Sequence, residues 1–337
     1  MPKLSELLTR NEVLVALIIV VLSAIIWAIN PAYLSTANIF RTVRSGIVIG
    51  ILAMGVMVVL ISGGIDVSFM AIAIFSLYST TKILMWMGYT GPFEVAFLIG
   101  GGIGLLLGLF NGFFIAIFRL PTLIVTLGTL SLFRGFMLFF IGSTHISDVP
   151  EPMKNYYRAF LLEFTPPSGR GMVNLHATVL ILVIAAIVCY LLLRYTTLGR
   201  GIYAMGGDRE AAARAGFNIR RIQFFIYGFA GMIYGVAGVT FGVLQRPVNP
   251  FDLVGNELEV LAAVVLGGAS IMGGRGGVIG TLLGVLLITI VSNNLVMVGI
   301  PSDWQRVMIG ALLIIGMAIP AIQAQRSANM TVANAGD

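Results

Sequence analysis

The chain has 337 residues, of which 58% are hydrophobic and only 10% are charged. Soluble domains are about 25% charged, so this composition excludes a soluble enzyme, a disulfide-rich secreted scaffold and a disordered protein. The formal net charge of +6 requires no nucleic-acid partner, because membrane proteins collect Lys and Arg in their cytoplasmic loops. We therefore expect an all-α polytopic protein embedded in a lipid membrane.

Ten apolar runs predict about ten transmembrane helices, since a helix needs about 20 residues to cross a bilayer. They form one transmembrane domain over residues 1–337, with a core at about 13–322. The first run is expected to stay as a signal anchor, and the eighth is short enough to be a broken or partial span. The predicted spans are 13–29, 47–61, 67–85, 95–118, 122–141, 177–193, 222–243, 258–266, 278–298 and 307–322.

Two long loops differ in charge, and the difference predicts the orientation. The loop 194–221 holds six arginines and two acidic residues, whereas the loop 142–175 has equal numbers of basic and acidic residues. Positively charged loops stay in the cytoplasm, so we expect 194–221 and both termini there, and 142–175 on the extracytoplasmic side. Arg41 and Arg44 fall on the extracytoplasmic side against this rule, at a helix end.

Glycines recur about every fourth residue in four predicted spans, which places them on one face of each helix. They are Gly46 and Gly50 in the second span, Gly100, Gly104, Gly108 and Gly112 in the fourth, Gly231, Gly235 and Gly238 in the seventh, and Gly276, Gly280 and Gly284 in the ninth. Such strips let helices pack closely in lipid. The matching strips predict two related halves around a pathway; the alternative is that any polytopic bundle is rich in glycine.

Residues 208–216 predict a short cytoplasmic helix with both ends marked. Asp208 can cap the first turn, and Gly216 suits the left-handed position after the last turn. The helix is too short to be stable alone, and it suits docking to a cytoplasmic protein; the alternative is an ordinary surface helix. The residues assigned to docking are Asp208, Arg209, Glu210, Ala212, Ala213, Arg214 and Gly216, with the two alanines as a small face and the charged side chains as its rim.

A few polar residues interrupt the apolar runs and are candidates for a translocation pathway. Asp66 follows Gly63 and Gly64, where it can cap the next helix near the interface or contact an ion or substrate. Arg134 lies inside the fifth run and is expected to be paired for structural reasons; the alternative is contact with the substrate. Four uncharged residues, which can hydrogen-bond a polyhydroxylated solute or join neighbouring helices, are Thr126, Thr129, Asn293 and Asn294.

No catalytic or metal-binding pattern is visible in the chain. The glycine-rich run 266–277 lacks the lysine that a phosphate-binding P-loop requires, so any ATP hydrolysis must occur in another chain. His145 and His176 have no metal-ligand spacing, and neither a Ser/His/Asp set nor an HExxH motif is present. We expect no bound cofactor, no metal and no intramembrane enzyme.

Four segments resemble the permease subunits of ribose-type monosaccharide ABC importers. They are 58–68 (VVLISGGIDVS), 120–130 (LPTLIVTLGTL), 199–207 (GRGIYAMGG) and 259–276, in the order of that family. Phe69 and Met70 depart from the small residue and glycine that are usual there. The resemblance implies the fold of vitamin B12-type importer permeases, with ten spans in each of two subunits, identical or different, in a bacterial cytoplasmic membrane.

The resemblance also implies partners for the chain. These are a periplasmic or surface-tethered sugar-binding protein and a cytoplasmic ABC ATPase that holds ATP and Mg, with residues 199–216 in contact with the ATPase. The expected function is ATP-driven import of a pentose or hexose. Alternatives within the family are a sugar-like signal, a polyol, a nucleoside or an amino acid. A different class stays open: an ion-coupled secondary transporter with Asp66 as its ion site.

Overall fold

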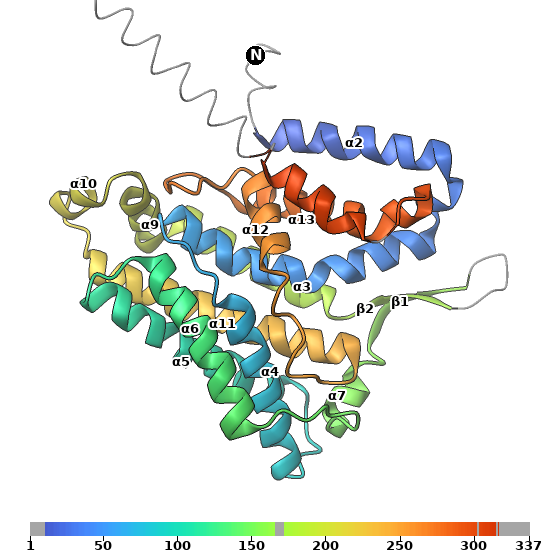
Figure 1. Ribbon diagram of the computed structural model, residues 1–337, viewed down its shortest axis with the longest axis horizontal. Helices are drawn as coiled ribbons and strands as arrows, with labels where there is room; N and C mark the ends of the chain where they lie inside the picture. The colour runs from blue at the N-terminus through green and yellow to red at the C-terminus, as the bar shows by residue number, and fades with distance from the viewer. Residues whose placement is uncertain (1–10, 166–171, 302, 315, 317–337) are drawn as a thin grey trace, which may run out of the picture.

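The computed structural model describes residues 11–165, 172–301, 303–314 and 316, and helices dominate this part of the chain (Figure 1). The long helices are α2 (Asn11–Ile29), α3 (Thr36–Ile61), α4 (Phe69–Trp86), α5 (Glu94–Ile117), α6 (Thr122–Phe136), α8 (Val179–Tyr195), α11 (Ile219–Gln245) and α13 (Val278–Asn294). The shorter elements are η1 (Pro31–Leu34), η2 (Met137–Ile141), α7 (Glu151–Tyr156), β1 (Phe160–Phe164), β2 (Val173–His176), α9 (Thr197–Gly207), α10 (Arg209–Arg214), α12 (Glu257–Leu266) and η3 (Leu295–Val298).

Within the described residues, seven helices are long and apolar enough to cross a membrane, or eight if α8 and α9 form one span bent by 77°. This establishes a polytopic membrane protein, but the predicted count of ten is not reached. The eighth predicted span is α12, a helix of only ten residues, as its short apolar run indicated. The tenth, 307–322, lies partly outside the described residues, and its described part belongs to the short helix Trp304–Ile314.

Helix α3 is the central element of the bundle. Ser35 caps its first turn by accepting a hydrogen bond from the Asn38 N–H, and from Ile47 to Ile61 nearly every side chain is buried. Helices α8 and α11 contact α3, as do α12 and α13, and α2 packs against α13 at one end of the bundle (Figure 1). A helix that is apolar on all sides belongs in the interior, and α3 and α4 fit this rule.

The glycine strips of the fourth and seventh predicted spans pack against each other. A Cβ atom at Gly104 of α5 would overlap the Gly231 carbonyl oxygen of α11, and one at Gly231 would overlap the Gly104 carbonyl oxygen. Gly108 has the same relation to the carbonyl of Tyr227, whereas Gly112 has only ordinary contacts, the nearest at 3.4 Å. Side chains at these sites would therefore force the two backbones apart.

The strip of the ninth span is shorter than the sequence indicated. Gly280 and Gly284 of α13 lie against the backbones of Gly267 and Ala263, at the end of α12. Gly276, which was predicted to extend this strip, precedes the first residue of α13 and has a φ of +148°. It is therefore a loop residue in a conformation that favours glycine, and it packs against Ile61 and Ala269.

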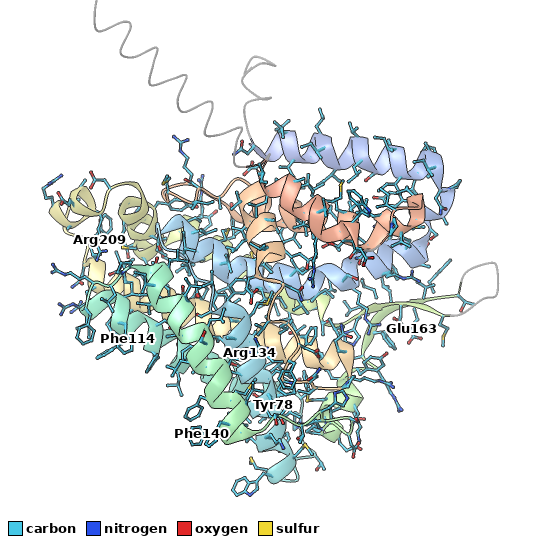
Figure 2. The ribbon with its side chains drawn as sticks, in the orientation of Figure 1. Tyr78, Phe114, Arg134, Phe140, Glu163 and Arg209 are labelled. Carbon is cyan, nitrogen blue, oxygen red and sulfur yellow. The ribbon has the colours of Figure 1, made fainter. Side chains whose placement is uncertain are left out.

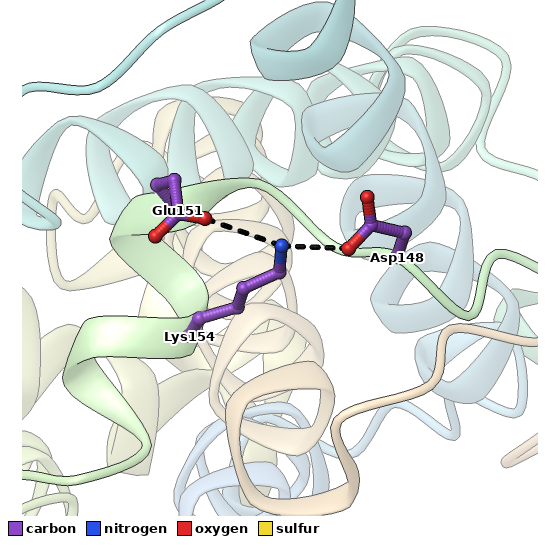
Figure 3. Close-up of polar contacts among 3 residues, drawn as sticks. All are labelled: Asp148, Glu151 and Lys154. Atoms are coloured by element: carbon purple, nitrogen blue, oxygen red, sulfur yellow. Dashed lines mark hydrogen bonds and ion pairs between the residues drawn. The ribbon is translucent and has the colours of Figure 1, made fainter.

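The loop 142–175 contains structure that the all-α prediction omitted. Strands β1 and β2 pair antiparallel, and α7 precedes them; residues 166–171 lie outside the described part. Figure 3 shows the charges that start α7: the Lys154 Nζ lies 2.6 Å from the Asp148 carboxylate and 3.3 Å from that of Glu151. These hydrogen bonds raise the pKa of Lys154. Lys154 thus pairs with two of the three acidic residues of this loop.

His176, to which the sequence analysis assigned no role, holds this segment onto the bundle. Its Nδ1 accepts a hydrogen bond from the Thr178 N–H at 3.1 Å, so Nε2 carries the proton and donates to the Tyr157 carbonyl at 3.1 Å. The ring is buried, and burial lowers the pKa of His176. The neutral imidazole is therefore the form that fits both partners.

Replacing Gly104 by Leu should prevent normal assembly of the bundle, because its side chain would meet the α11 backbone rather than a movable side chain. Gly102→Leu is the matched control, since a Cβ there has no atom within 4 Å. We expect monodisperse, heat-stable protein only from the control, as measured by size-exclusion chromatography and thermal unfolding in detergent. Equal yield and melting temperature for both variants would show that the contact is dispensable.

Candidate functional site

Helix α10 has the N-terminal and C-terminal capping residues that the sequence predicted. Asp208 Oδ1 accepts hydrogen bonds from the backbone N–H groups of Glu210 and Ala211, each at 2.9 Å. Those bonds lower the pKa of Asp208, and anions at this end of a helix are also favoured by its dipole. Gly216 has a φ of +90° after the last turn. The predicted caps are therefore confirmed.

The two faces of α10 differ from the prediction. Ala212 was expected to offer a small docking surface together with Ala213, but it is only 3% exposed and faces its own chain. Ala213 is exposed, as is the 3.7 Å ion pair between Glu210 and Arg214. Arg209, labelled at the tip of the bundle in Figure 2, donates to Gln223 Oε1 of α11 at 3.1 Å. Ala212 and Arg209 thus hold α10 in place, and Ala213 is available to a partner.

Glycines at the end of α9, just before α10, and in the loop 267–277 contact the end of α3. The Gly274 N–H donates to the Ile61 carbonyl at 2.8 Å, and a Cβ at Gly206 would overlap that same carbonyl. Gly273, with a φ of +89°, lies against Gly206 and Gly63. Three distant segments (the end of α3, the end of α9 and the loop 267–277) therefore meet backbone to backbone at Gly206, two residues before the Asp208 cap. We call this contact the glycine junction.

The loop after α3 carries Asp66, which is 2% exposed. Its Oδ1 accepts hydrogen bonds from the Ser68 N–H at 2.8 Å and from the Ser68 hydroxyl at 2.7 Å. Asn111 of α5 donates to that hydroxyl at 2.8 Å. Asp66 therefore orders the turn before α4, which is a structural role, but it does not cap the helix: the N-cap of α4 is Ser68, without a side-chain cap bond. Asp66 also lies inside the bundle rather than near the interface.

Two threonines of α6 hold the same loop. Thr122 Oγ1 accepts from the Ile65 N–H at 3.0 Å, and Thr126 Oγ1 donates to the Ile65 carbonyl at 3.2 Å. Thr129 is also buried and donates to the Thr126 carbonyl at 3.4 Å. The structure therefore brings Asp66, Thr126 and Thr129 together, with all three engaged in contacts within the chain.

The asparagines of α13 lie elsewhere. Asn294 Oδ1 accepts from Asn38 Nδ2 of α3 at 2.7 Å, and Asn294 Nδ2 is 3.5 Å from the Thr42 hydroxyl. Asn293 Nδ2 is buried and has no partner in the described part of the chain. Asn294 therefore joins two helices. The Arg134 side chain, in contrast, makes no ion pair or hydrogen bond with any described residue, so the pairing expected for it is not found.

A cavity of about 520 Å³ lies between α3, α11 and the start of α12. Its base is apolar and includes Met70, one of the two residues that depart from the family pattern, and Phe241. Its polar wall, none of which was among the predicted pathway residues, consists of Arg41, Arg44, Ser45, Gln245, Asn256 and Glu259. We call this space the α3–α12 cavity.

Several charged groups of the α3–α12 cavity are fixed by neighbours. Arg44 donates to the Leu244 carbonyl at 3.0 Å and lies over the Tyr157 ring, which Arg246 approaches at 3.8 Å. Glu259 accepts from the Ser292 hydroxyl at 2.8 Å. Arg41 and Arg44, which disagree with the predicted orientation, were thus the sequence signal for this cavity. Guanidinium groups donate hydrogen bonds, carboxylates accept them and side-chain amides do both, a combination that suits a polyhydroxylated solute.

Comparison with known proteins identifies the family of the chain. The family described as "Branched-chain amino acid transport system / permease component" matches residues 38–317. The ribose import permease protein of Bacillus subtilis (strain 168) is 32% identical over 301 residues, with 89% of each chain covered. No solved structure matches the chain.

Two further relatives differ in substrate. The xylose transport system permease protein of Escherichia coli (strain K12) is 27% identical, with 94% of this chain and 92% of the relative covered. The autoinducer 2 import system permease protein of Enterobacter sp. (strain 638) is 32% identical, with 92% and 87% covered. The chain therefore belongs to the branched-chain amino acid transport system / permease component family.

Proposed function

We propose that this chain is the transmembrane permease subunit of an ATP-binding cassette importer for a monosaccharide, a pentose or hexose. The observation that carries the proposal is the match to ribose and xylose permeases over about nine-tenths of this chain. The chain is a transport subunit rather than an enzyme, and ATP and Mg belong to a separate ATPase. A sugar-like signal, a polyol, a nucleoside or an amino acid is the alternative cargo.

The α3–α12 cavity is proposed as the outer end of the translocation pathway. Its position near Tyr157 of the loop 142–175, which is expected on the extracytoplasmic side, supports this proposal, because a binding protein would deliver sugar on that side. Asp66, Thr126, Thr129 and Asn294 bond within the chain, which favours a structural role over pathway contact. The importer fold of two related halves, with two subunits, identical or different, around the pathway, is part of the same proposal.

The loop 194–221 is proposed as the cytoplasmic coupling loop, with α10 seated on the ATPase and both termini on that side of the bacterial cytoplasmic membrane. Its arginine content supports this orientation. Arg209 ties α10 to α11, and the glycine junction ties the preceding residues to α3. A displacement of α10 would therefore move α3, which lines the α3–α12 cavity. Backbones in direct contact leave no flexible side chain between them that could adjust to the displacement.

Vesicles containing the chain, its ATPase and its binding protein should take up radiolabelled ribose or xylose only when ATP is supplied to the cytoplasmic face. The control is the same vesicles with a sodium or proton gradient and no ATP, in which we expect no uptake, since Asp66 is engaged in the turn before α4. Uptake driven by the gradient alone would identify an ion-coupled transporter and contradict the proposal.

Asn256→Ala should reduce the initial rate of uptake roughly three- to tenfold, the effect of one lost hydrogen bond, while the ATPase still co-purifies. Asn256 makes no side-chain cap for α12, so the truncation should spare the helix. Leu258→Ala is the control, because this exposed side chain does not line the α3–α12 cavity. Equal rates for the two variants would remove Asn256 from the pathway.

Ala213→Trp should abolish co-purification of the ATPase, because a bulky side chain on the exposed face of α10 would block a close interface. Ala213→Ser is the control and should retain binding. Ala212→Trp should instead disturb the seating of α10 in its own chain, visible as a lower melting temperature without the partner. If the Ala213→Trp protein binds the ATPase and transports normally, α10 is only a surface turn.

A further inference from the structure

A second cavity, of about 420 Å³, lies where α8 bends into α9. It shares no lining residue with the α3–α12 cavity, and only its assignment to the cytoplasmic side rests on the proposed orientation. Its walls come from the end of α8, from α9, from the first turn of α13 and from Glu12 at the start of α2. We call it the α8–α13 cavity.

Its charged groups are suited to an anion. Arg194 and Arg200 both line the α8–α13 cavity, and neither guanidinium has a hydrogen bond or ion pair with another residue that the structure describes. Tyr203 is held in the wall by donating to the Gly276 carbonyl at 2.8 Å. With Glu12 as the opposing charge, the lining keeps a net positive charge.

The first turn of α13 adds hydrogen-bond donors to the same wall. Gly277 and Val278 line the cavity, and no side chain caps this helix of 17 residues. Free N–H groups at the start of a helix favour an anion, and phosphate groups are their usual ligands. The guanidinium groups of Arg194 and Arg200 and the N-terminus of α13 therefore line the same cavity. Such hydrogen-bond donors and positive charges are suited to binding a phosphate group.

The cavity also opens beside apolar surface. Tyr190 and Ile279 line it and are 42% and 61% exposed, and Tyr195 one turn beyond Tyr190 is 67% exposed. Exposed tyrosines at the end of an apolar helix mark the membrane–water interface, and the 77° bend sends α9 away from the direction of α8 at this depth. A ligand bound here has a phosphate at the interface and an apolar part against α8 and α13.

We propose that the α8–α13 cavity binds the headgroup of an anionic phospholipid, with its acyl chains along the exposed apolar side chains of α8 and α13. Arg194 and Arg200 bind the phosphate, because basic pockets between helices on the cytoplasmic side select anionic lipids. A soluble phosphate has the same charged head but gains nothing from Tyr190 and Ile279. The cavity shares Gly276 and α9 with the surroundings of the glycine junction, so a bound lipid would buttress the segment that precedes α10.

The test compares nanodiscs of phosphatidylcholine with and without phosphatidylglycerol, and measures by native mass spectrometry the lipid that stays with the purified chain. The wild-type chain should retain phosphatidylglycerol in preference. The double variant Arg194→Gln/Arg200→Gln should retain it about tenfold less. Arg220→Gln/Arg221→Gln, with the same charge removed from exposed positions outside the cavity, is the matched control and should retain it like the wild type.

Two further measurements keep the test decisive if the double variant does not fold. Retention by the wild-type chain should fall as salt is raised, since the contact is electrostatic, and inorganic phosphate at the same ionic strength should displace no more lipid than sodium chloride does. The proposal would be overturned if the two double variants lost the same amount of bound phosphatidylglycerol, or if the wild-type chain showed no preference for this lipid. Displacement of the lipid by inorganic phosphate but not by sodium chloride would also overturn it, because it would identify a site for the free ion.

Discussion

The contact between α5 and α11 is the constraint on which the rest of the bundle depends. In lipid there is no hydrophobic drive to bring two helices together, so association relies on dispersion and on close approach. Gly104 and Gly231 each lie against the other's carbonyl oxygen, which is as near as two helices can come. Helix α11 also packs on α3 and α4, so this one approach sets the position of the buried core and of the helix that carries Arg44.

The polar groups inside the membrane region serve mainly to fix loops and helices. Asp66, Ser68 and Asn111 connect the turn before α4 to α5, Thr126 connects it to α6, and Asn294 connects α13 to α3. Each buried donor that finds an acceptor in the chain avoids the penalty of desolvation. Other buried polar atoms, such as the hydroxyls of Ser76, Ser79 and Thr80 in α4, have no partner among the described residues, whereas the charged groups of the α3–α12 and α8–α13 cavities are open to a solute or a lipid headgroup.

The sequence predicted contacts between residues that are close together along the chain, but not contacts between residues that are far apart along it. The Asp208 cap and the Gly216 turn involve neighbours within a few residues, and both were predicted correctly. The glycine period identified the contacting face of α5 but not its partner, because periodicity carries no information on which helix lies opposite. The inward face of Ala212 depends on α9 and α11, and the walls of the α3–α12 cavity come from segments about 200 residues apart. His176 looked isolated because its partner Tyr157 lies across a hairpin.

The reciprocal glycine contact restricts how the gene can change. An α-helix turns by about 100° per residue, so one inserted or deleted residue between Gly100 and Gly108 would rotate part of the strip away from α11 and bring a side chain such as Leu105 or Leu106 toward its backbone. Substitution on the lipid side of α5, as at Gly102, meets no such barrier. Helix α5 can therefore drift widely in composition while its length between these glycines stays constant.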